Sequence, residues 1–324
     1  MENVCFEWNL VPFLVKTKIV DELSFRSLPF FASCSRECFY LFNRFRAFHV
    51  VDSFSIFIQI ENDGSFEAEI SEGEDVNDLQ EKDENVFDRN AANHLKVDLE
   101  HFEKHDFNDD VDGIKHFLKH VHAVGSIELD ICCADSDDAN RVLDEIWSEL
   151  GRGLESAQKL IVHRFPNRLF PSLFLKAERV ESLGLLSARR SFSDRVDFEV
   201  LRQSLPNLRT PLRRFVCDYL IRPNDQLLEM ISSKSKNLEL LFIFGVSDEA
   251  IHEFIKKPLF APKCKLIFSF SEGFYQWRQV GKAIECAADS TTKLSVTNLP
   301  AAFYLEKNRC RLLVALVKPY RAFV

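Results

Sequence analysis

A short apolar motif recurs between residues 92 and 296 of this 324-residue chain. An apolar residue, two further residues, a second apolar residue, one further residue and a third apolar residue are followed by a helical segment. The clear copies are Val124-Ile127-Leu129, Ala157-Leu160-Val162, Val180-Leu183-Leu185, Leu212-Phe215-Cys217 and Leu238-Leu241-Ile243; the weaker copies are Ala92-Leu95-Val97, Lys263-Leu266-Phe268 and Thr291-Leu294-Val296. From Ile127 onward the central residues lie 23 to 33 residues apart. A strand and a helix at this spacing predict an α/β solenoid over residues 92–324.

The segment after the first clear copy shows the helical pattern best. Its apolar face consists of Ala139, Val142, Leu143, Ile146, Trp147 and Leu150. Asp135-Ser136 supplies an N-cap and Gly151 a stop signal, so the pattern predicts an amphipathic helix between them.

Residues 51–91 predict a strand pair followed by an acidic linker. Ile56, Ile58 and Ile60 alternate with polar residues, residues 62–65 supply turn chemistry, and the alternation resumes from Phe66 to Ile70. Residues 61–90 carry twelve acidic and two basic side chains. Residues 71–90 have few apolar side chains, so we expect them to form a linker or long loop.

The charge distribution argues against nucleic-acid binding. The net charge is −9, and residues 61–90 account for it, so no basic stripe remains for a phosphate backbone. Residues 1–15 are acidic before their apolar run, unlike a secretory signal, and no apolar run reaches the roughly 20 residues that span a bilayer. Most cysteines have apolar neighbours, as buried free thiols do: Cys34, Cys132, Cys217 and Cys264. We therefore expect a cytoplasmic or nuclear protein that does not bind membranes.

A histidine cluster suggests metal chemistry but does not match a metal motif. His101 and His105 lie four residues apart, as do His116 and His120, and ligands at that spacing on a helix can share an ion. The glutamate of His-Glu-x-x-His is misplaced. The calcium-loop-like run 108–113 is followed by Lys119 where a glutamate ligand is needed. We expect a solvated helix face, and no catalytic residue, metal or cofactor, because glycine-rich nucleophile and phosphate motifs are also absent from the sequence.

The first 50 residues predict a small helical module. Val15, Ile19 and Leu23 share a helix face, as do Phe31, Cys38, Leu41 and Phe45. This segment resembles the F-box. Val11-Pro12 stands at the family's Leu-Pro, Ile19, Leu23 and Leu28 stand at its spaced anchors, and residues 31–36, Phe39 and Leu41 stand at its closing segment. The chain departs from the family at Lys16 and Cys38, where a leucine and a tryptophan are usual.

The resemblance implies a fold and a function. The repeats look like the divergent leucine-rich or F-box-associated tails of nematode-type F-box families, although the asparagine ladder is missing. An F-box would bind a Skp-family adaptor, and through it a cullin, using Val11, Pro12, Val15, Ile19, Leu23, Leu28 and Phe31. The repeat domain would bind an unknown protein target, which makes the chain the substrate-recognition subunit of a cullin-RING ubiquitin ligase. That role involves no catalysis.

Alternatives remain open from the sequence. The first helices could instead be an amphipathic bundle that caps a repeat-based interaction scaffold, and a metal-dependent hydrolase is a distant third. Several repeat strands are also apolar on both faces, at Ile161, Leu186, Val216, Phe242, Phe244 and Ile267. These residues form either a parallel sheet that is covered on both sides or an apolar groove that binds the target through Phe242 and Phe244.

Overall fold

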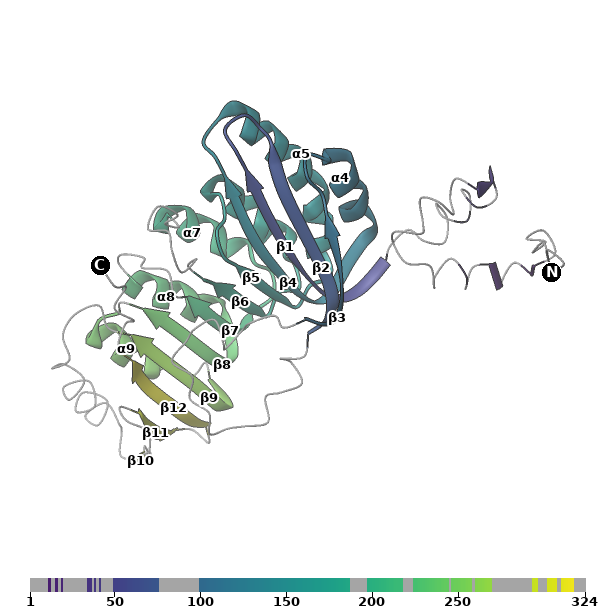
Figure 1. Cartoon of the computed structure of the whole chain (residues 1–324). Helices are drawn as coiled ribbons and strands as arrows, with labels where there is room; N and C mark the ends of the chain where they lie inside the picture. The colour runs from purple at the N-terminus through teal and green to yellow at the C-terminus, as the bar shows by residue number, and fades with distance from the viewer. Residues whose placement is uncertain are drawn as a thin grey trace.

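Twelve strands form one mixed sheet in this computed structural model (Figure 1). The structure describes residues 11–12, 15–16, 19, 34–36, 38, 41, 49–75, 99–186, 197–217, 224–244, 246–257, 260–269, 293–296, 302–307 and 310–317. The strands are β1 (His49–Ile60), β2 (Phe66–Asp75), β3 (Leu99–Asp106), β4 (Val121–Cys133), β5 (Lys159–Val162), β6 (Ser182–Leu185), β7 (Leu212–Cys217), β8 (Ser235–Phe244), β9 (Phe260–Ser269), β10 (Lys293–Val296), β11 (Ala302–Lys307) and β12 (Cys310–Val317). The α-helices are α4 (Val111–His120), α5 (Asp137–Gly153), α6 (Phe170–Lys176), α7 (Phe198–Ser204), α8 (Asn224–Lys234) and α9 (Asp248–Ile255), and the 3-10 helices are η5 (Leu154–Ser156), η6 (Asn167–Leu169) and η7 (Leu205–Asn207). The fold class is α/β, as the sequence predicts.

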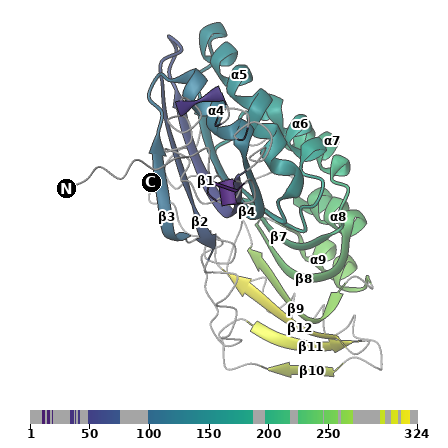
Figure 2. The same ribbon diagram turned by 90° about the vertical axis from the view of Figure 1, so that its right-hand side faces the viewer.

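The central part of the sheet is parallel, and its helices lie on one face. From β4 to β9 each strand pairs in parallel with the next strand of the chain, and a helix connects them. Parallel crossovers are right-handed, and here they all advance across the sheet in the same direction, so their helices must lie on the same side. Figure 2 shows α4 to α9 in a row along that face. We call the opposite side, on which the described residues place no helix, the helix-free face.

The hydrophobic core lies between the strands and this helix row. The central residues of the repeated motif are cross-strand neighbours and are fully buried: Ile127, Leu160, Leu183, Phe215, Leu241 and Leu266. The apolar positions of α5 that the sequence singles out also lie in this core. Spacing in the sequence therefore translates directly into one continuous apolar layer.

Antiparallel strands extend both ends of the sheet. β1 pairs with β4 in parallel and with β2 in antiparallel orientation, and β2 pairs with β3. At the other end β12 pairs in parallel with β9 and continues into antiparallel β11 and β10. The predicted solenoid is therefore wrong for the described residues. Within residues 92–324, β3 joins β2, and β10, β11 and β12 join one another, as antiparallel strands, so these segments extend the sheet rather than add strand-and-helix repeats. β1 and β2 form the hairpin that the alternation at residues 56–70 predicts, with its turn at residues 61–65.

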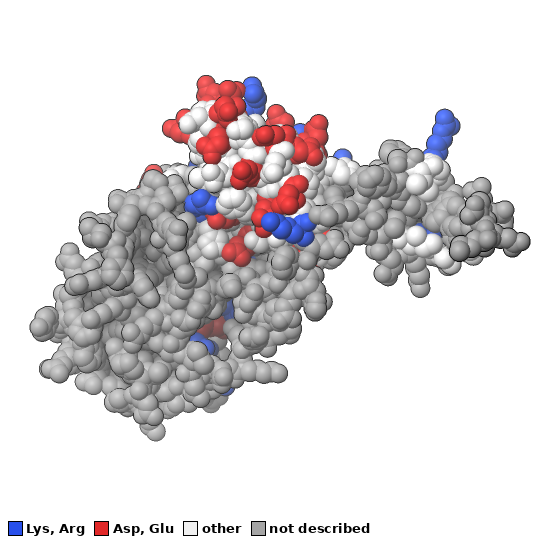
Figure 3. Space-filling view, viewed as in Figure 1, with Lys and Arg blue, Asp and Glu red and all other residues white. Residues whose placement is uncertain are grey.

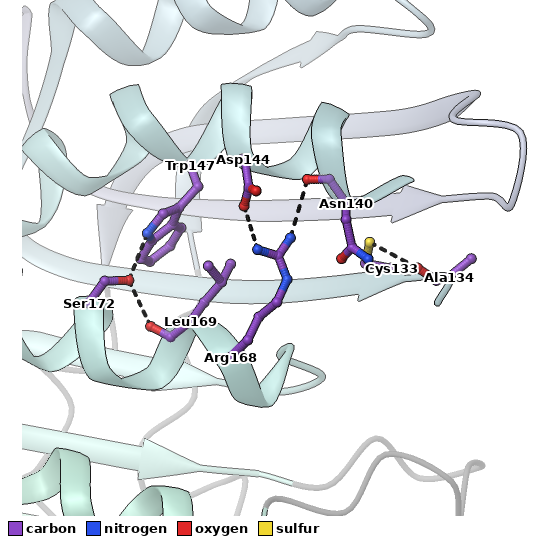
Figure 4. Close-up of polar contacts among 8 residues, drawn as sticks. All are labelled: Cys133, Ala134, Asn140, Asp144, Trp147, Arg168, Leu169 and Ser172. Carbon is purple, nitrogen blue, oxygen red and sulfur yellow. Dashed lines mark hydrogen bonds and ion pairs between the residues drawn. The ribbon is translucent and has the colours of Figure 1, made fainter. Parts of the chain in front are cut away.

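The contact between α5 and α6 shows how neighbouring connections are fixed to each other (Figure 4). Arg168 in η6 donates to the Asp144 carboxylate at 2.5 Å and to the Asn140 carbonyl at 3.2 Å, so one guanidinium joins two positions of α5. On the same side the Trp147 indole N–H donates to the Ser172 hydroxyl at 2.8 Å. These three hydrogen bonds join α5 to η6 and α6 and hold the two connections in register.

Other local predictions have mixed outcomes. Ser136 caps α5 by accepting from the Ala139 N–H at 3.1 Å, as expected, but the helix continues past Gly151 to Gly153. Residues 71–75 belong to β2, whereas residues 76–90 of the predicted linker lie outside the described residues. Within the described part of the chain, no helix combines the length and the apolar character needed to cross a membrane.

Candidate interaction surface

One row of side-chain positions crosses the helix-free face and changes character halfway. The register runs through Lys104, Ser71, Ser55, Glu128, Ile161, Gly184, Val216, Phe242, Ile267 and Ala315, in sheet order. The positions on β3, β2, β1 and β4 are polar or charged, and those from β5 onward are apolar or glycine. The helix-free face thus has a polar half and an apolar half.

The apolar half is buried. Ile161, Val216 and Phe242 have no exposed surface, and Leu186 and Ile267 are almost as fully covered. Of the two sequence interpretations, burial supports a parallel sheet that is covered on both sides, whose strands are apolar on both faces for that reason. Phe242 is therefore not an exposed anchor for a target. The side chain of Phe244 lies outside the described residues.

The polar half carries carboxylates that are partly neutralised by neighbouring cations. Glu128 pairs with His163, and Asp130 accepts two hydrogen bonds from Arg164, at 2.6 and 3.1 Å. The Arg164 guanidinium also lies 5.4 Å from the centre of the Phe57 ring. Figure 3 shows acidic side chains gathered over this part of the molecule. These pairs hold the strand ends together, and the half-exposed Phe57 ring adds an apolar spot to a charged surface.

The outermost strand of this half is β3, and the ladder fixes the direction of its backbone groups. The Phe107 N–H donates to the Ala68 carbonyl at 2.8 Å, so Phe107 faces β2. Backbone direction alternates along an antiparallel strand, and so the N–H and C=O of Asp106 point away from β2. In the strand order of the described residues β3 is the last strand. Asp106 therefore presents its backbone at the outer edge of the sheet.

The side chains around this edge are charged and exposed. Lys104 lies 2.7 Å from Glu69 and 3.5 Å from Asp106. The hydrogen bond to Glu69 is the main reason that the pKa of Lys104 is raised above its ordinary value. Glu67, on the same face of β2, is also exposed. Two carboxylates, those of Glu69 and Asp106, therefore lie beside one ammonium group at this edge, and Glu67 adds a third carboxylate on the same face of β2. The alternating charges of β2 and β3 are visible in the sequence, but the edge itself emerges only from the strand order.

The structure describes four of the seven proposed adaptor-binding residues. Val15 and Ile19 are helical, and the Pro12 carbonyl accepts from the N–H groups of Val15 and Lys16, which begins a helical turn. Pro12 is exposed, Val15 is 45% exposed, and Val11 and Ile19 are half-buried. Leu23, Leu28 and Phe31 lie outside the described residues.

The two residues that depart from the F-box pattern are both buried. Lys16 is 5% exposed, and Cys38 is buried together with Leu41. None of these three residues belongs to the core cluster of the sheet, whose first residue is Val51. The described N-terminal residues therefore bury side chains away from the core of the sheet.

The histidine cluster is divided between two elements. His105 lies in β3, where it is buried beside Glu72 and against the Phe117 ring, so the expected solvated helix face is wrong for this residue. His116 lies in α4, and burial, followed by the charge of Lys119, lowers its pKa. Asp110 caps α4, accepting from the Gly113 N–H at 2.8 Å. Among the described residues no group of three or more His, Cys, Asp or Glu side chains could hold a metal ion.

Replacing both His116 and His120 by glutamine is expected to leave metal content and partner binding unchanged, because among the described residues, which include the His116 side chain, no group of His, Cys, Asp or Glu could hold a metal ion. Elemental analysis of the purified wild-type and double-variant proteins is the measurement. Stoichiometric zinc in the wild type that disappears from the variant would overturn this expectation.

The described cysteines differ in exposure. Cys217 and Cys264 are buried as expected, Cys132 is half-buried, and Cys34 is exposed, contrary to the prediction. Burial raises the pKa of the Cys133 thiol, so it is a poor nucleophile at neutral pH.

Comparison with known proteins adds no relative to this picture. No protein-family model matches the chain, and no curated protein matches its sequence. The fold and the surface therefore define the class on their own: an α/β protein whose described helices line one face of the sheet, and whose opposite face has a charged half and a buried apolar half.

Proposed function

We propose that this chain is a substrate-recognition subunit of a cullin-RING ubiquitin ligase. Its N-terminal helices bind a Skp-family adaptor as an F-box does, and its sheet domain binds a protein target. No bond is made or broken by the chain in this role. It raises the effective concentration of target lysines near a ubiquitin-loaded enzyme held elsewhere in the assembly. Such a protein acts in the cytoplasm or the nucleus.

The observation that carries the proposal is the position-by-position match of residues 11–41 to the F-box, together with the exposure of Pro12 and Val15. An F-box binds through apolar side chains projected from short helices. Val15 is one of two large apolar side chains that are exposed in the described part of the chain. Exposed apolar groups on a short helix are suited to burial in a protein interface.

A second feature that supports the proposal is the independence of the sheet core. The core cluster begins at Val51 and includes residues as far as Leu312, without any described residue of the first 41. A module that lies outside this core can be held by an adaptor while the sheet domain stays folded and binds a target.

Replacing Val15 by glutamate tests the adaptor role. The charge would be buried at the interface, so we expect at least about a tenfold loss of affinity for a purified Skp-family adaptor. Leu175→Glu is the matched control, because Leu175 is 54% exposed on α6, outside the segment that matches the F-box. Equal capture of both variants and the wild type would show that Val15 does not contact the adaptor.

The alternative function is an interaction scaffold without a ubiquitin role, whose first helices form a cap. The burial of Lys16 favours it, because the F-box pattern has an apolar residue there and a buried amine must be paired within its own chain. Target binding without adaptor binding would support this alternative.

A further inference from the structure

We propose that the outer edge of β3 binds an extended, lysine- or arginine-rich segment of the target protein as an added strand. The inference rests on the proposed function, since it names the class of target that the sheet domain recognises. It replaces the apolar groove around Phe242, which is closed.

The first observation is the direction of the backbone at this edge. Asp106 directs its N–H and C=O away from β2, and β3 ends the strand order of the described residues. Outward-directed backbone groups at the end of a sheet are a template for an extended peptide, which gains affinity from main-chain hydrogen bonds. This observation selects the shape of the ligand, independently of any charge.

The second observation is the charge around the edge. Glu67, Glu69 and Asp106 lie on the helix-free face of β2 and β3, and Lys104 offsets only part of their charge. Side chains of an added strand point alternately to the two faces of the sheet. Those on the helix-free face would lie beside these carboxylates. Charge complementarity therefore selects a segment with basic residues at alternate positions.

The third observation separates this edge from the rest of the helix-free face. The carboxylates nearer the middle of the sheet are already engaged, Glu128 by His163 and Asp130 by Arg164, and the apolar side chains of the row on β5, β7, β8 and β9 are buried. Side chains at the edge are more exposed: Asp106 is 60% exposed and Glu69 is 43% exposed. The edge is therefore the part of this face where a partner meets carboxylates that are open to solvent.

The test uses the full-length protein and a fluorescent peptide of alternating lysine and threonine. We expect saturable binding that weakens as salt is added, because exposed charges are screened. Two control peptides separate the contribution of charge from that of main-chain hydrogen bonds. A peptide with glutamate in place of lysine should not bind. A peptide with alternate backbone nitrogens methylated keeps its charge but cannot complete a hydrogen-bond ladder with β3. The methylated peptide should bind at least about tenfold more weakly than the unmethylated peptide.

Variants of the protein locate the site. Asp106→Pro removes the outward N–H and should bind roughly tenfold more weakly than Asp106→Ala, which removes only the charge. Glu67→Lys combined with Glu69→Lys should weaken binding, whereas the same reversal at Asp137 and Asp138 of α5 should not. Any one of three results would overturn the inference. The methylated peptide binds as tightly as the unmethylated one, the two Asp106 variants bind the peptide equally, or the α5 reversal weakens binding as much as the Glu67 and Glu69 reversal does.

Adaptor capture by the same variants separates this inference from the proposed function. Edge variants should still bind the adaptor. Peptide binding without adaptor binding by the wild type would leave the edge site in place and remove the ubiquitin role, whereas adaptor binding without peptide binding would do the reverse.

Discussion

Replacing Phe242 by alanine is expected to lower the free energy of unfolding by about 3–5 kcal/mol, the range for a buried phenylalanine whose cavity does not collapse. Phe242 has no exposed surface and lies between Val216 and Ile267 in neighbouring strands. Removing its ring would leave a cavity in the middle of a parallel sheet. Chemical denaturation followed by circular dichroism measures the change.

The matched control is Leu175→Ala on the surface of α6. Leu175 is 54% exposed, so the expected change lies within about 0.5 kcal/mol. A Phe242 variant as stable as the wild type, but unable to capture cellular targets, would contradict the burial and restore the exposed groove.

Six copies of the repeated motif, from Ile127 to Leu266, predict the parallel strands β4 to β9, whereas the copy at Thr291-Leu294-Val296 falls in β10, which pairs in antiparallel orientation. Apolar residues at fixed spacing mark the strand positions that face the helices, and Leu160, Leu183 and Phe215 occupy those positions. The motif could not predict a sheet rather than a solenoid. That difference depends on how segments far apart in the sequence pair: β1 with β4 and β12 with β9 in parallel, and β2 with β3 in antiparallel orientation. Pairing between distant segments leaves no periodic signal in the sequence.

The interaction surface was less predictable, for a related reason. Phe242 alternates with core residues, and alternation alone does not reveal whether the second face of a strand is covered. The edge at Asp106 is defined by the absence of a further strand in the described sheet order, which is a property of the assembled sheet. His105 shows the same limit, because its four-residue spacing from His101 suggests a helix, although both lie in β3.

Replacing both Leu23 and Leu28 by alanine is expected to abolish adaptor capture. Loss of one buried leucine costs about 2–5 kcal/mol where the site cannot collapse, which corresponds to a roughly thirtyfold to several-thousandfold fall in affinity. Both leucines stand at F-box anchor positions. Capture by immobilised adaptor, compared with the wild type over a range of concentrations, measures the effect.

The folding of the sheet domain is the control for this double variant. Its core cluster begins at Val51, so the unfolding transition of the sheet should stay unchanged while adaptor capture is lost. Loss of the whole unfolding transition would instead mean that the two leucines belong to the core and that the first helices are a structural cap.

Calorimetric titration of the full-length wild-type chain with a purified Skp-family adaptor tests the central claim most directly. The account predicts a saturable one-to-one complex with a dissociation constant of about 1 μM or lower, equivalent to roughly 8 kcal/mol or more of binding free energy. Absence of binding at adaptor concentrations of about 100 μM, with the chain fully folded, would contradict it.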